Sequence, residues 1–136
     1  MFYFALACMD YVITHDLDYW KSPDMLYQYW MALAIVVGVF SFSLASFGYL
    51  NGLPSKQATA TFITSIMLFV AGLLDYFYAT IATLRGENYH WSGWNFCYKI
   101  FVANGLLSSW EWPQQIVWSL GCVGLIILAW YWALKK

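Results

Sequence analysis

The chain has 136 residues, of which 62% are hydrophobic and only 10% are charged. A typical soluble domain is about half apolar and about a quarter charged, so this composition excludes an ordinary water-soluble domain and a disordered chain. A net charge of −1 offers no basic surface, so we expect no nucleic-acid partner. Thirty aromatic residues and a mean hydropathy of +0.60 indicate an integral membrane protein with one domain.

Residues 1–20 form the first candidate span. The stretch is apolar up to Thr14 apart from Asp10, and its helical pattern continues to Trp20. About 20 residues suffice to cross a bilayer, so we expect a span that carries one acid. The alternatives are a helix lying in the membrane interface, and a chain that is a fragment of a longer protein.

Three further segments are long and apolar enough to cross a bilayer: 28–50, 58–84 and 114–134. Only the second of them carries a charge, at Asp75. The short polar stretch 51–57 contains Gly and Pro, which predicts a tight turn between two antiparallel helices.

Residues 85–112 differ from the spans because they are rich in tryptophan and tyrosine. These side chains collect at the boundary between membrane and water, where the ring is apolar and its N–H or O–H group meets water. We expect an interfacial segment there, anchored by four tryptophans: Trp91, Trp94, Trp110 and Trp112. The predicted fold is therefore all-α, an integral membrane bundle of three or four transmembrane helices with an aromatic-rich interfacial segment.

The loops divide into two sides of the membrane. Side A carries residues 14–27 and 85–112, and side B carries residues 51–57 and the C-terminus. Each side holds three Lys or Arg residues, but those of side B lie in very short segments without acids. The excess of positive charge in cytoplasmic loops therefore favours side B as the cytoplasmic side.

Asp75 is the most informative single residue, because an acid within a span costs roughly 2.5–3.5 kcal/mol on insertion and is read first as functional. Asp10 lies ten residues before Trp20 and Asp75 lies ten residues before Arg85, so a helical rise of about 1.5 Å per residue places both at a similar depth below side A. Equal depth permits a shared proton or cation site, but it does not establish lateral contact. The alternative for both acids is a structural role in holding the bundle together.

A second set of polar residues lies on side A. Nitrogen and oxygen donors of the kind that bind zinc, copper or iron follow two of the predicted helices: His15, Asp16, Asp18, Glu87 and His90. Their spacing matches no metal motif, so a divalent metal is one interpretation. The other is a set of interfacial residues that cap helices and meet lipid headgroups.

Three functions fit this sequence. The first is a non-catalytic subunit of a larger membrane complex, because the chain is small and lacks a complete catalytic set. The second is a membrane-embedded enzyme or metal-binding protein that uses the side A residues. The third is a small transporter coupled to protons or cations through Asp75, which requires self-association because four helices are too thin to enclose a path.

Overall fold

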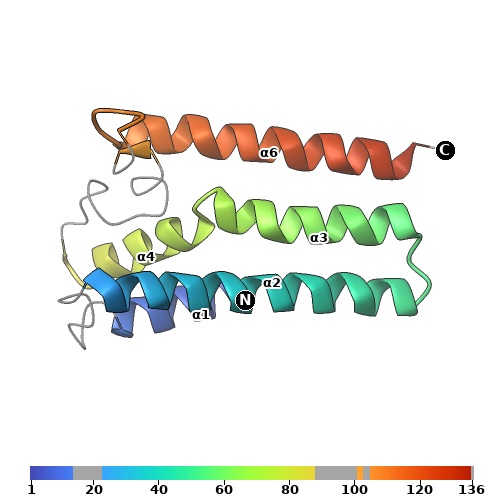
Figure 1. Ribbon diagram of the computed structural model, residues 1–136, viewed down its shortest axis with the longest axis horizontal. Coiled ribbons are helices and arrows are strands. Elements are labelled where there is room, and N and C mark those ends of the chain that lie inside the picture. Colours follow the sequence, from blue (N-terminus) through green and yellow to red (C-terminus); the bar gives the residue numbers. More distant parts are fainter. Residues whose placement is uncertain (14–22, 88–100, 103–104, 136) are drawn as a thin grey trace.

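The computed structural model describes residues 1–13, 23–87, 101–102 and 105–135, except for the side chains of residues 23–27 and 30. These described residues form five helices and no strand, which confirms the all-α prediction (Figure 1). The helices are α1 (Phe2–Tyr11), α2 (Pro23–Leu50), α3 (Ser55–Val70), α4 (Leu73–Leu84) and α6 (Trp112–Leu134).

Two helices are long and apolar enough to cross a membrane: α2 over Met31–Leu50, and α6 over its whole length. A third span exists if α3 and α4, which meet at an angle of 46°, are taken together. The expected fourth span over residues 1–20 stays a prediction, because α1 covers only ten residues and 14–22 lie outside the described part.

Helix α3 lies in the middle of the bundle and packs against α2 on one side and α6 on the other. A tight turn at Asn51–Gly52 joins α2 to α3 as an antiparallel hairpin, as the sequence predicts (Figure 1). The C-terminus lies at this same end, where the Lys56 ammonium group donates to the Lys135 carbonyl at 3.4 Å. The two segments assigned to side B therefore meet at one end of the molecule.

The segment predicted as one span over 58–84 is instead broken into α3 and α4. Helix α3 ends at Val70, and Gly72 adopts a left-handed conformation with φ of +83° before α4 begins. Glycine adopts this conformation without steric cost, whereas any residue with a Cβ atom is strained there. The break at Ala71–Gly72 turns the chain away from the axis of α3.

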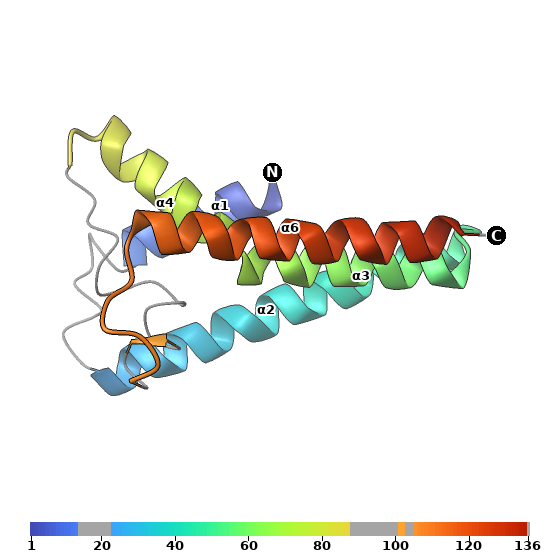
Figure 2. The ribbon, with the colours of Figure 1, turned by 90° about the horizontal axis from the view of Figure 1, so that it is seen from above.

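Helix α1 fills the space that this bend creates. Figure 2 shows α2 and α4 spreading apart toward the side A end, with α1 between them. Leu6 and Ala7 of α1 share one buried cluster with residues of α2, α3 and α4: Leu33, Val37, Phe69 and Leu74. The start of α1 is tied to α3 because the Tyr3 hydroxyl donates to the Ser65 carbonyl. Burial of this apolar surface stabilises α1 in its place between α2 and α4.

A buried acid pair beside a helix break

The two acids of the predicted spans lie in the core of the side A half. Asp10 of α1 is 4% exposed and Asp75 in the first turn of α4 is 6% exposed. Helices α1 and α4 pack directly on each other, and the two carboxyl groups lie within electrostatic range of one another. The structure thus brings together two acids that the sequence places only at equal depth. We call Asp10 and Asp75 the acid pair.

Asp75 has few polar neighbours for a buried acid. Among the residues that the structure describes, none donates a hydrogen bond to its carboxyl group. The nearest polar side chain on α6 is Gln115: a Cβ atom added at Gly72 would lie 2.3 Å from Gln115 Nε2 and 3.2 Å from Asp75 Oδ2. The carboxyl group and the amide therefore flank the same point, and only glycine at position 72 leaves room for both.

Tyrosines surround the other member of the pair. The phenol of Tyr29 on α2 lies beside the Asp10 carboxyl group. Next along α1, Tyr11 packs its ring against Tyr78 of α4 with a centroid separation of 5.0 Å. Asp10 therefore lies beside one phenol group and next to a residue whose ring packs on another tyrosine.

Side chains of α6 bind the carbonyl oxygens that the break releases from helical hydrogen bonding. The Ala71 carbonyl accepts from Gln115 Nε2 at 2.9 Å and from Ser119 Oγ at 2.7 Å. The Val70 carbonyl accepts from the Trp118 indole N–H at 2.8 Å. A buried carbonyl without a partner is costly in a bilayer, so these three side chains, the α6 donors, stabilise the break.

The α6 donors are themselves held by further hydrogen bonds. Gln115 is fully buried, and its Oε1 accepts from the Trp110 indole N–H at 2.9 Å. The Tyr76 hydroxyl lies 2.9 Å from Ser119 Oγ, which links α4 to α6.

This network was not predicted from the sequence, although the spacing of residues 115, 118 and 119 places three polar groups on one helix face. Trp110, predicted as an interface anchor, is buried and points inward to Gln115.

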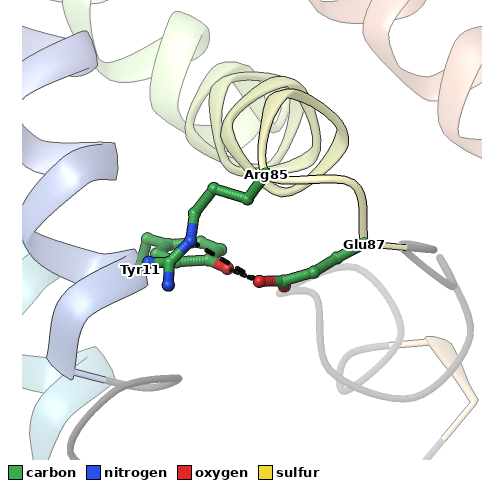
Figure 3. Close-up of polar contacts among 3 residues, drawn as sticks. All are labelled: Tyr11, Arg85 and Glu87. Carbon is green, nitrogen blue, oxygen red and sulfur yellow. Dashed lines mark hydrogen bonds and ion pairs between the residues drawn. The ribbon is translucent and has the colours of Figure 1, made fainter.

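The side A end of α4 is joined to the end of α1 by three residues (Figure 3). The Tyr11 hydroxyl donates to Glu87 Oε1, and Arg85 Nε lies 3.6 Å from the same oxygen. The Arg85 guanidinium group also lies 5.0 Å from the centroid of the Tyr11 ring. These contacts fix α1 against α4 one residue beyond Asp10.

The structure gives little information on the predicted metal set. Four of its five residues, and two of the predicted anchors, lie outside the described part: His15, Asp16, Asp18, His90, Trp91 and Trp94. Glu87 is described and is engaged by Tyr11 and Arg85. Within the described ranges there is no cluster of three His, Cys, Asp or Glu residues that could hold a metal ion. The divalent metal stays a prediction. Trp112 is exposed at the start of α6, and its role as an interface anchor stays a prediction.

Comparison of the chain with protein-family models, with curated proteins and with solved structures gives no match. The function therefore has to be argued from the acid pair and its surroundings.

Proposed function

We propose that this chain is a small, self-associating membrane carrier coupled to protons or cations, with Asp75 as the coupling acid and Asp10 as its partner. One observation carries the proposal: Asp75 is buried beside a second buried acid and receives no hydrogen bond from any described residue. An acid with a purely structural role is expected to be satisfied by donors, because an unsatisfied buried polar group costs about 1–3 kcal/mol. A transported proton or cation would supply a partner that the described residues do not.

The break between α3 and α4 supports the same function. Interrupted helices are tolerated at membrane depth where they line a site or are buried in protein, and carriers place their ion sites at such interruptions. Here Asp75 lies three residues after Gly72, in the first turn of the second half-helix. The bend gives α4 a pivot at the level of the acid.

Self-association follows from the thinness of the bundle. The described helices α2 and α6 expose most of their apolar side chains, including Val39, Phe47 and Leu120. Neighbouring copies or lipid can cover these faces, and two or more copies are needed to enclose a path.

We further propose a multi-pass topology with residues 51–57 and the C-terminus on the cytoplasmic side.

Charge displacement in proteoliposomes on a solid-supported membrane tests this function without knowledge of the carried solute. A sudden change of pH or of cation concentration moves charge when an ion enters a site within the membrane. The proposal predicts such a signal for the natural chain and its loss in Asp75→Asn. Glu111→Gln makes the same chemical change at an exposed position and should leave the signal intact. Equal signals in the natural chain and Asp75→Asn, or no signal in either, would contradict the proposal.

A second candidate function is a non-catalytic subunit of a larger membrane complex. The observation that favours it is the packing of α6, whose main contact in the described part of the chain is α3, so that its outer face is available to another protein. Native mass spectrometry after mild extraction separates the two candidates. Other polypeptides in fixed ratio would support the subunit, whereas copies of this chain alone would support the carrier.

A further inference from the structure

We infer that the ion held by the acid pair is a proton and that the site does not take a metal cation. The inference rests on the proposed function and identifies the ion that the proposed function leaves open. It is drawn from the hydrogen bonds at the helix break, where the oxygens that a metal cation needs are already bound by α6.

The carbonyl oxygens at the break are the natural ligands for a cation in a carrier of this kind. In this protein the Ala71 carbonyl accepts from Gln115 Nε2 at 2.9 Å and lies 2.7 Å from Ser119 Oγ, whose single proton is also 2.8 Å from the Gln115 carbonyl. The Val70 carbonyl accepts from Trp118. A metal cation would have to compete with these α6 side chains at either oxygen.

The remaining oxygens do not complete a coordination shell. Hard cations such as Ca²⁺ and Mg²⁺ take six or more oxygen ligands, and those that the protein does not supply must come from water. Gln115 Oε1, the amide oxygen nearest to the break, already accepts from the Trp110 indole N–H. No third carboxylate, histidine or cysteine joins the pair within the described residues. The site is also enclosed, since Asp10, Asp75 and Gln115 are all buried.

A proton needs none of these ligands. Two carboxyl groups buried within electrostatic range of one another disfavour the charge on each other, and a proton held by the pair relieves the repulsion. Among the described residues, the titratable groups nearest the pair are phenols: Tyr29 from α2 faces Asp10, and Tyr78 on α4 lies near Tyr29 and Tyr11. Arg85, just after α4, lies over the Tyr11 ring and 3.6 Å from Glu87, one residue beyond Asp10. Helix α6 presents the uncharged Gln115 and Ser119, and no described basic side chain acts on either carboxyl group of the pair.

This inference is tested on the same proteoliposomes by changing the pH and the metal-cation concentration suddenly and separately, and by measuring the charge that each change displaces. At constant sodium, potassium and calcium, a pH jump is expected to displace charge in the natural chain. At constant pH, a jump of sodium, potassium or calcium chloride is expected to displace none beyond protein-free liposomes. Asp75→Asn should lose the pH-jump signal, and Asp75→Glu, which keeps a carboxyl group, should retain part of it. Glu111→Gln should behave as the natural chain.

The outcomes separate the inference from the proposed function. A metal-cation signal at constant pH that disappears in Asp75→Asn would overturn the inference and leave the carrier standing with a metal cation as its ion. No signal for any ion in the natural chain would overturn both. Infrared difference spectra guard against misfolding, because the Asp75 contribution to the titrating carboxyl band should be missing in Asp75→Asn while the amide bands stay unchanged. A carboxyl band that responds to sodium, potassium or calcium at constant pH would also overturn the inference.

Discussion

The side B half and the side A half of this molecule differ in how the backbone carbonyls of their helices are bound. In the side B half, hydroxyl groups return to carbonyls of their own helix, as Thr59 does to Ser55 at 3.0 Å and Thr61 to Gln57 at 2.9 Å, and Trp130 of α6 donates to a side chain of α3, Thr64 Oγ1, at 2.9 Å. In the side A half, side chains of α6 donate to backbone carbonyls of the broken helix, as Gln115 and Ser119 do to Ala71.

The helix break explains this difference. Unbroken helices satisfy their own backbone, so their surfaces need only apolar packing and small hydroxyls. At Ala71–Gly72 the carbonyls lose their helical partners, and the neighbouring helix must supply donors. A polar network then forms in the core, and the acid pair lies beside it. Substitutions matched between the two halves should therefore differ in cost.

The largest difference is expected between two left-handed glycines. Gly72→Ala introduces a Cβ atom 2.3 Å from Gln115 Nε2 at a φ of +83°, so strain and steric overlap should together cost about 2–5 kcal/mol. Gly52→Ala at the side B turn has a similar φ of +92° but open space around it, so only the conformational cost of about 1–2 kcal/mol should remain. Thermal unfolding in detergent measures both. Equal costs would show that the break does not depend on contact with α6.

The next effect concerns two glutamines of the bundle, one buried and one partly exposed. Gln115→Ala removes one donor from the Ala71 carbonyl and leaves the buried Trp110 N–H without its acceptor, which should cost about 2–3 kcal/mol. Gln57→Ala lies at the start of α3, where the partly exposed side chain makes no hydrogen bond with the described residues, and should change stability little. Unfolding in a denaturing detergent titration compares the two. A Gln115→Ala protein as stable as Gln57→Ala would remove the α6 donors from this account.

A smaller effect is expected for the indole donor. Trp118→Phe keeps an aromatic ring against Phe101 but loses the hydrogen bond to the Val70 carbonyl, so it should cost about 1–1.5 kcal/mol. Trp132→Phe on the exposed side B end of α6 provides the control and should cost less than about 0.5 kcal/mol. Melting temperatures of the two variants, measured side by side, decide whether the hydrogen bond or the ring stabilises this part of α6.

The smallest effect is expected at the contact between α1 and α4. Tyr11→Phe keeps the ring beneath Arg85 and removes only the hydrogen bond to Glu87, whose partly exposed carboxyl group can bind water instead. The cost should be about 0.5–1 kcal/mol, against none for Tyr49→Phe, which is exposed at the opposite end. Hydrogen exchange of α1 amides is the more sensitive measurement, and unchanged exchange would show that the contact does not hold α1 in place.

Much of the fold could be predicted because its main signal is apolar length. The segments 28–50 and 114–134 correspond to α2 and α6, and the turn after Leu50 was evident from Gly52 and Pro54. The break at Gly72 was not predicted, because a glycine in an apolar run is common in membrane helices and its left-handed conformation depends on the contact with Gln115.

The candidate site was predictable only in part. The positions of Asp10 and Asp75 along their segments indicate a common depth, but the angular position of each helix depends on packing that no single sequence displays. Gln115 is the second residue of the predicted span 114–134, and nothing in the sequence distinguishes it, because its partners Ala71 and Trp110 are distant in sequence or lie in a loop. The α6 donors became recognisable only with the broken helix beside them.

The central claim is that Asp75 is retained for ion binding and not for stability. Its most direct test combines unfolding and pH-jump charge displacement on one variant, Asp75→Asn, because the amide has nearly the shape of the carboxyl group without its charge. We predict a protein at least as stable as the natural chain, since the cost of burying the acid is removed, with the charge displacement abolished. A destabilised Asp75→Asn protein that still displaces the same charge would contradict the account and assign the acid pair to the structure of the bundle.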